Sequence, residues 1–342
     1  MKRIAYAALL LVVSVAVGFM LGPVPPEPNL DPTPATNTIQ IDSLDAWIEQ
    51  HERGFKTLKP NNEADIEWYN DSVSVTEYSI VYLHGFTASK EEGNPVHRSF
   101  AKRYGCNLYL TRLYGHGLDT TEPLLTLTPE NYLRSAKEAV AIGKTIGKKV
   151  ILMCTSTGAT LGLYMAAHDP AITSVICYSP NIDIYDPNSH YLTKPWGLQM
   201  VRLAMGSNYR EYEAIDEFKK YWQTKYRIEG LVSVRTLINH TMILEIFKKI
   251  TQPVFVGAYY KDEEHQDKVV SVVAMKNMMP QLGTVENQKR FVAFPNAGEH
   301  VITNTIKAKD VESVSMATND FAEQVLGMKP IDKKAPPNWQ GF

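Results

Sequence analysis

The sequence is poor in cysteine and in net charge. Three cysteines stand among 342 residues, so at most one disulfide can form, and the spacings of Cys106, Cys154 and Cys177 fit no metal-binding pattern. Each lies in or beside an apolar stretch, which predicts buried free thiols. The 35 basic residues nearly balance the 37 acidic ones, and no dense Lys or Arg stripe is present. A nucleic acid is therefore not an expected partner.

The amino-terminal segment is apolar. Met1, Lys2 and Arg3 place positive charge before an uncharged, mostly apolar run from Ile4 to about Gly22. A run of roughly 20 residues is long enough to span a bilayer. It predicts a signal anchor or a cleaved signal peptide in residues 1–22, and hence a membrane-anchored or exported, extracytoplasmic protein. Residues 23–40 are rich in proline, which predicts an extended, semi-rigid linker.

The rest of the chain, residues 41–342, has the alternation of an α/β protein. Apolar runs rich in β-branched and aromatic residues suit parallel strands that are covered on both faces. Helical segments separate these runs, so we expect one doubly wound, mostly parallel sheet. The expected strands are 78–83, 107–112, 149–154, 174–178, 253–259 and 289–294, and the expected helices are 42–52, 94–103, 128–146, 158–167, 270–282 and 311–327.

Residues of about 182–248 interrupt this alternation. They hold no convincing strand, but they contain helical pieces rich in aromatic residues and methionine. We expect a helical cap over the carboxyl edge of the sheet, with some of its side chains lining an apolar substrate pocket. The apolar side chains in question are Trp196, Met200, Leu203, Met205, Tyr212, Phe218, Trp222, Ile243 and Phe247.

Ser156 stands between the expected strand 149–154 and the expected helix 158–167. A nucleophilic serine on a tight strand-to-helix turn needs small residues two positions before and two after it. Gly158 meets this need, whereas Cys154 stands where the G-x-S-x-G motif has glycine. The flanking strand and helix predict a nucleophile elbow, and a serine that only caps the helix is the alternative.

A second motif, His84-Gly85-Phe86, ends the expected strand 78–83. Acyl transfer places negative charge on the carbonyl oxygen, and an N–H donor fixed in advance at that point lowers the barrier by about 3 kcal/mol. We expect the backbone N–H groups of Phe86 and of Thr157, the residue after the nucleophile, to form this oxyanion hole.

These motifs resemble those of the α/β-hydrolase superfamily, in its carboxylesterase and monoacylglycerol-lipase-like branch. The resemblance covers about residues 75–325 and rests also on Tyr-Gly-His-Gly at 114–117 and Gly-Glu-His at 298–300. It implies His300 as the general base, because the order along the chain in this family is serine, acid, histidine. An imidazole suits the role because its ordinary pKa of about 6.5 lets it accept and return a proton at neutral pH.

The acid of the triad belongs in the turn after strand 253–259, which offers two candidates. Asp267 stands just before the Val-Val pair that typically anchors this turn in the family. Asp262 lies at the usual distance from the start of the strand. An insertion of about five residues, which loops tolerate well, favours Asp267 and leaves Asp262 as the alternative. The acid would orient the imidazole and stabilise the imidazolium.

The resemblance implies a serine hydrolase that cleaves carboxylic esters through an acyl-enzyme, with no metal or organic cofactor. The apolar cap favours an apolar acyl or lipid ester as the substrate. A thioesterase and a serine aminopeptidase are alternatives on the same fold, and Glu211, Glu213 or Asp216 would bind the free amine of a peptide. A non-catalytic, membrane-tethered binding protein is the alternative of another class. The sequence predicts no oligomeric state.

Overall fold

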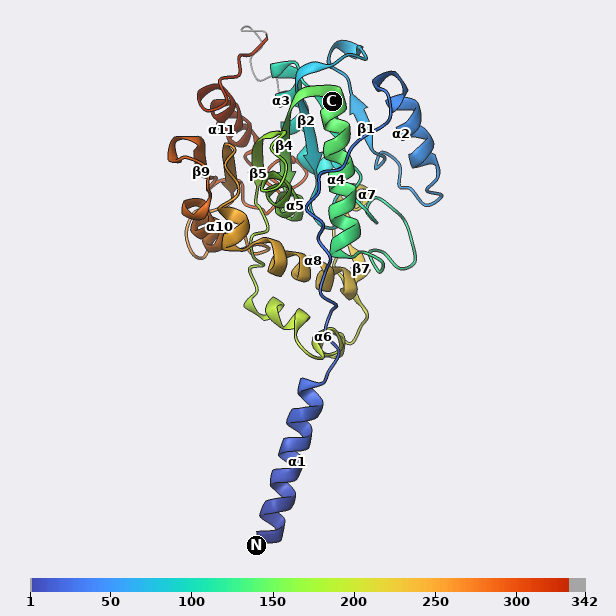
Figure 1. Ribbon diagram of the computed structural model, residues 1–342, viewed down its shortest axis with the longest axis vertical. Coiled ribbons are helices and arrows are strands. Elements are labelled where there is room, and N and C mark those ends of the chain that lie inside the picture. Colours follow the sequence, from blue (N-terminus) through green and yellow to red (C-terminus); the bar gives the residue numbers. More distant parts are fainter. Residues whose placement is uncertain (1, 332–342) are drawn as a thin grey trace.

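The centre of the fold is a seven-stranded sheet with the order β1-β3-β2-β4-β5-β8-β9 (Figure 1). The computed structural model describes residues 2–331. All neighbouring strands are parallel except β1, which pairs antiparallel with β3 at one edge. The strands are β1 (Asp65–Glu67), β2 (Thr76–Leu83), β3 (Asn107–Leu110), β4 (Gly147–Thr155), β5 (Ile172–Tyr178), β8 (Val254–Ala258) and β9 (Lys289–Ala293).

Helices cover both faces of this sheet. Outside the cap they are α2 (Leu44–Arg53), α3 (Val96–Tyr104), α4 (Pro129–Ile146), α5 (Thr157–Ala166), α10 (Val272–Met278) and α11 (Val311–Gln324). Side chains alternate between the two faces of a strand, so β2 contributes Val81 and Leu83 to the core under α4 and α5, and Ile80 and Tyr82 to the core under α3 and α11. The predicted doubly wound, mostly parallel sheet is confirmed.

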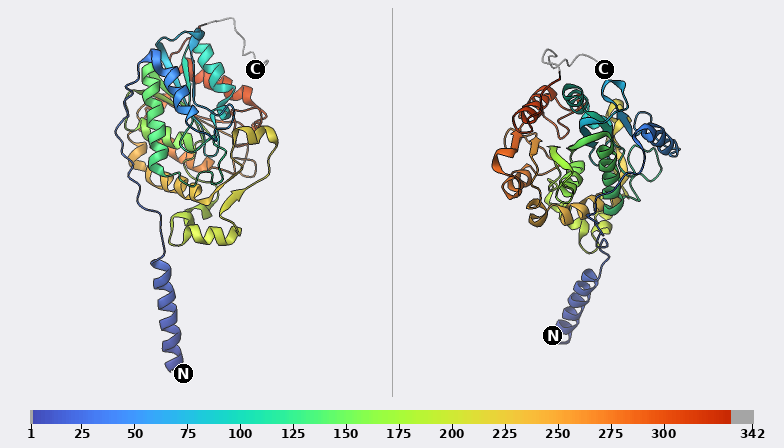
Figure 2. Two further views of the ribbon diagram at one scale, coloured as in Figure 1. Left: turned by 90° about the vertical axis from the view of Figure 1, so that its right-hand side faces the viewer. Right: turned by 45° about the horizontal axis from the view of Figure 1, so that its top comes forward.

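The amino-terminal segment forms helix α1 (Lys2–Met20), which projects away from the domain in both views of Figure 2. Within residues 2–331, none of the helices is both long and apolar enough to cross a membrane. The expected membrane-spanning signal anchor is therefore not supported.

The cap is inserted between β5 and β8. It consists of helices, as predicted, and of a two-stranded antiparallel ribbon that was not predicted. Each strand of the ribbon has three residues and carries charged side chains, so neither produces an apolar alternation. The elements are α6 (Gly197–Met205), β6 (Tyr209–Glu211), α7 (Asp216–Tyr221), β7 (Lys225–Arg227), α8 (Ile228–Thr241) and α9 (Leu244–Phe247).

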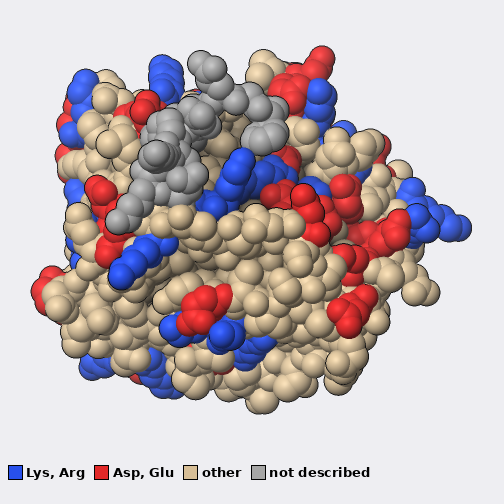
Figure 3. All heavy atoms as spheres, turned by 90° about the horizontal axis from the view of Figure 1, so that it is seen from above, with Lys and Arg blue, Asp and Glu red and all other residues tan. Residues whose placement is uncertain are grey.

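The apolar side chains of the cap divide into two groups. Phe218, Trp222 and Phe247 are buried, whereas Leu203 on α6 is 84% exposed. The outer surface of α6 therefore does not belong to the core. On the face of the molecule opposite α1, acidic and basic side chains are interspersed (Figure 3).

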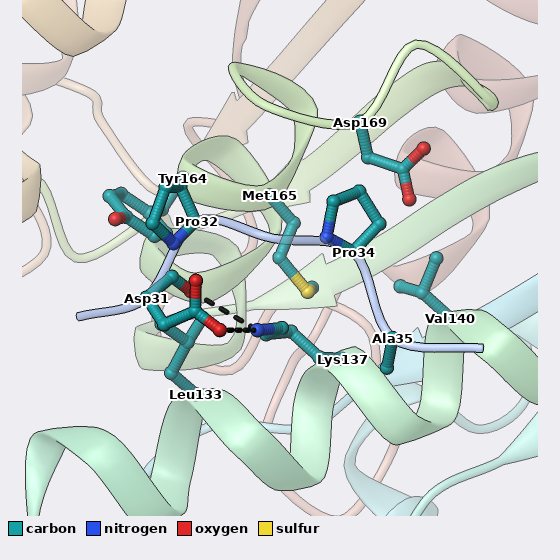
Figure 4. Close-up of a pocket in the computed structure, with 10 residues that line it drawn as sticks. All are labelled: Asp31, Pro32, Pro34, Ala35, Leu133, Lys137, Val140, Tyr164, Met165 and Asp169. Carbon is teal, nitrogen blue, oxygen red and sulfur yellow. Dashed lines mark hydrogen bonds and ion pairs between the residues drawn. The ribbon is translucent and has the colours of Figure 1, made fainter.

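Residues 23–40 lie along the domain as an extended strap without helix or strand. The Tyr164 hydroxyl of α5 donates a hydrogen bond of 2.8 Å to the carbonyl of Leu30, and Lys137 of α4 pairs with Asp31 at 3.2 Å. Pro32 and Pro34 lie over α4 and α5 and enclose a cavity of about 10 Å³ there (Figure 4). The strap is therefore packed on the domain along its length.

Candidate active site

Ser156 occupies a sharp turn between β4, which ends at Thr155, and α5, which begins at Thr157. Its φ of 53° and ψ of −121° lie in a region that side-chain-bearing residues rarely adopt. A Cβ at Gly158 would lie 2.1 Å from the carbonyl oxygen of Leu83, so only glycine lets α5 start this close to the end of β2. The turn has the form of the expected nucleophile elbow.

Cys154 stands where the elbow motif has glycine, and the structure explains why it fits. Its side chain is fully buried on β4 and points at α5. A Cβ at Gly162 would lie only 2.7 Å from the Cys154 sulfur, so glycine on the helix makes the room that glycine on the strand makes in the usual motif. All three cysteines are free and buried, as predicted.

The structure brings Asp267 and His300 together. His300 Nδ1 lies 2.6 Å from Asp267 Oδ2, and the other carboxylate oxygen accepts hydrogen bonds from the backbone N–H groups of Val269 (2.8 Å) and Val270 (3.1 Å). The carboxylate is completely buried. The carbonyl of His300 accepts a hydrogen bond of 2.7 Å from Ser179, so the histidine is fixed at its backbone as well as at its ring.

Asp262, the alternative acid, does not reach His300. Its carboxylate is half exposed and accepts hydrogen bonds from the backbone and the ring of His265. The loop that carries Asp262 closes on itself, because Lys261 N–H donates a hydrogen bond of 2.9 Å to the carbonyl of His265. These extra residues project from the end of β8 and return the chain to the sheet edge at Asp267.

The electrostatic setting of His300 favours its protonated form. Burial alone lowers the pKa of this imidazolium, but the charge and the hydrogen bond of Asp267 raise it, and Glu92 and Glu299 add to that effect. The net pKa of His300 lies above its ordinary value. An imidazole with this pKa is suited to take a proton from a hydroxyl group in a transition state and to return it later.

The loop after β2 carries the expected oxyanion donor at Phe86. His84 is buried and joins this loop to the chain after β3, because its Nε2 accepts from Leu113 N–H at 3.0 Å and its Nδ1 lies 2.9 Å from the carbonyl of Gly85. Burial lowers the pKa of His84 far below its usual range, so the ring stays neutral. Thr157 is the first residue of α5, where backbone N–H groups have no partner inside the helix.

Sequence reasoning missed Glu92. Its carboxylate is buried and accepts a hydrogen bond of 2.6 Å from the backbone N–H of Gly85, next to the expected oxyanion donor. Burial raises the pKa of Glu92 to about 7, although this hydrogen bond opposes the shift. No sequence motif sets it apart from Glu91, whose side chain pairs with Arg98 instead.

The cap covers this loop. Gln223 N–H donates a hydrogen bond of 2.8 Å to the carbonyl of Thr87, and the rings of Phe86 and Tyr226 meet edge to face with centroids 5.2 Å apart. Trp222 packs with Val301, which follows His300. The acidic residues considered for a peptidase are largely exposed and pair with cap lysines, so none of Glu211, Glu213 and Asp216 has a described contact with this site.

Two cavities lie elsewhere. One is the small space under the strap, and the other, of about 280 Å³, lies between Pro23–Pro26 and the cap helices α6 and α8. Neither is lined by Ser156, Asp267 or His300. They are separate from the candidate active site.

Known proteins share this fold. A stretch of 105 residues is 30% identical to a thermostable monoacylglycerol lipase of Bacillus sp. (strain H-257); it spans 31% of this chain and 41% of that lipase. A structure of the metagenome-derived lipolytic enzymes LipS and LipT matches with a TM-score of 0.62 and 16% identity, over 77% of this chain and 98% of its own. No family model matches the chain.

A monoacylglycerol lipase of Paleococcus ferrophilus superposes with a TM-score of 0.55 and 13% identity, over 76% of this chain and 98% of its own. At such identities the structural matches establish the fold. Together with the mostly parallel sheet and its cap, they show that the chain has the α/β-hydrolase fold, which these lipolytic enzymes share.

Proposed function

We propose that this protein is a serine hydrolase that cleaves carboxylic esters through Ser156, His300 and Asp267. Ser156 Oγ attacks the ester carbonyl while His300 takes its proton, and the backbone N–H groups of Phe86 and Thr157 stabilise the oxyanion. The alcohol leaves with a proton from His300. Water, activated by the same imidazole, then releases the acid from Ser156.

The tautomer of His300 supports these roles. Its Nδ1 is engaged with the buried carboxylate of Asp267, so Nε2 is the nitrogen left to accept the serine proton. When the imidazolium forms, its positive charge is held beside a carboxylate that two backbone N–H groups keep in place. Asp262 has no part in this arrangement, and we assign the triad acid to Asp267.

An apolar acyl or lipid ester is the substrate we propose. Phe86 and Tyr226 bring aromatic surface over the expected oxyanion loop, and the buried Trp222 adds more beside Val301. Apolar pockets with a few fixed polar groups suit such ligands. The similarity to monoacylglycerol lipases agrees with this substrate class.

The observation that carries the proposal is the hydrogen bond of 2.6 Å between Asp267 and His300, at the sheet edge where Ser156 occupies its strained turn. Labelling with a fluorophosphonate probe tests it, because such probes react with activated serines. We expect the full-length protein to be labelled and Ser156→Ala and His300→Ala to remain unlabelled. Ser99→Ala, which removes a hydroxyl on α3, should be labelled like the wild type. A folded wild-type protein that takes up no probe and hydrolyses no ester of short, medium or long acyl chain would refute the proposal.

The apolar run of residues 4–22 supports export as a further part of the proposal. Residues 1–40, fused to a reporter that is active only outside the cytoplasm, should give activity. The same fusion with Leu10→Arg and Val13→Arg should give none, and equal activity of the two fusions would contradict export.

A further inference from the structure

Glu92 is a buried carboxyl group that the proposed mechanism does not use. It is 2% exposed, and its backbone is fixed by Thr303, whose hydroxyl donates a hydrogen bond of 2.7 Å to the Glu92 carbonyl. A buried carboxylate without polar partners is energetically costly, so the groups that contact Glu92 are needed to keep it buried. Those contacts connect Glu92 to the expected oxyanion loop and to the strand that precedes Ser156.

The first contact is with the expected oxyanion loop. Glu92 Oε2 accepts from Gly85 N–H at 2.6 Å, and Gly85 immediately precedes Phe86. A Cβ at Gly85 would lie 3.0 Å from Ser156 Cβ and 3.1 Å from Glu92 Oε1, so the carboxylate and the serine approach the same point of the loop. A larger residue at position 85 would be in tight contact with both groups.

The second contact is with the strand that carries the nucleophile. The Tyr82 hydroxyl lies 3.4 Å from Glu92 Oε2 and 2.9 Å from the hydroxyl of Thr155, the residue before Ser156. From the cap, the Trp222 side chain opposes the effect of burial and lowers the pKa of Glu92. Hydrogen-bonded chains of this kind stabilise one arrangement of the groups that they join.

We propose that Glu92 is a positioning residue of the active site, which fixes the Gly85 amide and thereby the direction of the Phe86 N–H, and whose charge stabilises the imidazolium of His300. It acts through these groups and touches no reacting atom. Groups of this kind lie behind a catalytic donor and hold it in the orientation that the reaction needs.

The titratable groups around the carboxylate make the role testable. Tyr82 faces it from β2, and burial together with the Glu92 charge raises the pKa of that phenol far above its usual range. Burial, with a smaller effect of Glu92, raises the pKa values of Tyr132 and Tyr212, which stay neutral near pH 7. The charge of Glu92 also raises the pKa of His300, and His300 in turn lowers the pKa of Glu92, so the protonation of one group depends on that of the other.

The experiment measures kcat and KM for an ester against pH in the full-length wild type, Glu92→Gln and Glu92→Ala, with Glu91→Gln as the matched control. Glu92→Gln keeps an oxygen for the Gly85 N–H and removes the charge, so we expect the acid limb of kcat/KM to move to lower pH and to depend on one proton. Glu92→Ala leaves the N–H without its acceptor, and kcat should fall about tenfold to 100-fold at nearly constant KM, as for a displaced oxyanion donor. Glu91→Gln should match the wild type.

A Glu92→Gln profile that superimposes on that of the wild type, with equal kcat, would overturn the inference. If Glu92→Ala does not fold, the profile of Glu92→Gln alone decides. The inference rests on the proposed triad, and the two fail differently. Without the triad, Ser156→Ala and His300→Ala retain activity; without the role of Glu92, those variants are inactive while the Glu92→Gln profile is unchanged.

Discussion

Replacing Asp267 with asparagine should leave the fold intact but move the ring proton of His300 from Nδ1 to Nε2. Two backbone N–H groups, of Val269 and Val270, donate to Asp267 Oδ1 at 2.8 and 3.1 Å. They would hold the amide oxygen of the new side chain in that place. The amide nitrogen would then face His300 Nδ1, from the position of an oxygen that now lies 2.6 Å away. A donor there forces the ring proton onto Nε2, so His300 can no longer accept the proton of Ser156.

The magnitude follows from this change of tautomer. In a Ser-His-Asp triad it costs about 10⁴-fold in kcat, which corresponds to about 5 kcal/mol of transition-state stabilisation. The carboxylate also raises the pKa of His300, so the acid limb of the remaining activity should lie at lower pH than in the wild type. Thermal unfolding should show that the variant remains folded.

Hydrolysis of a chromogenic ester, measured as kcat and KM, is the assay, and Asp262→Asn is the matched control. The Asp262 side chain is 51% exposed and bonded to His265, so its replacement should leave kcat unchanged. The reasoning fails if Asp267→Asn keeps kcat within tenfold of the wild type. It fails equally if Asp262→Asn is the variant that loses activity.

Three further predictions concern stability. Gly158→Ala should lower both Tm and labelling by a fluorophosphonate, because its Cβ would lie 2.1 Å from the Leu83 carbonyl oxygen. Arg112→Ala should lower the free energy of unfolding in urea by about 3–5 kcal/mol, because it leaves the buried Glu52 carboxylate without the guanidinium 2.5 Å away. Burial lowers the pKa of His116 to about 4. The unfolded chain therefore binds a proton there that the folded protein does not bind between that pH and about 6.5, and the free energy of unfolding should fall as the pH drops through this window, by up to about 3 kcal/mol from this residue.

Each of these predictions has a control. Gly206→Ala adds a Cβ with no atom within 4 Å at a φ of 60°, so it should cost only the backbone strain of about 1–2 kcal/mol. Arg53→Ala removes an exposed ion pair and should cost less than about 1 kcal/mol. His116→Leu should flatten the decline of stability below pH 6.5, and an unchanged decline would remove His116 from the explanation.

The sheet was predictable because parallel strands covered on both faces need continuous apolar runs. The run from Tyr78 to Leu83, for example, lies within β2. The edge strand β1 escaped prediction because its three residues, Asp65–Glu67, carry two acidic side chains and bury only the middle one. The ribbon of the cap escaped for a similar reason. Short strands stabilised by one neighbour leave little trace in hydrophobic periodicity.

The residues of the candidate site were predictable to a different degree. Both Ser156 and His300 stand two residues from a glycine that the backbone requires, so the sequence marks their turns. Gly158 lies close to the backbone of β2, and Gly298 has a φ of 76°. The choice between Asp262 and Asp267 depended on the path of a loop, and the sequence does not reveal that this loop closes on itself. The place of Glu92 depends on a hydrogen bond to the backbone of Gly85 across a folded loop, and no motif in the sequence around Glu92 predicts that contact.

The strap has a consequence for shortening the chain. A protein that began at residue 41 would leave the Tyr164 hydroxyl without the Leu30 carbonyl and Lys137 without Asp31, and it would uncover apolar side chains of α4 and α5. The strap also reaches the cap, because the Trp196 N–H donates to the carbonyl of Pro23 at 3.0 Å. A recombinant version without α1 is therefore best started at about residue 22, which preserves these contacts.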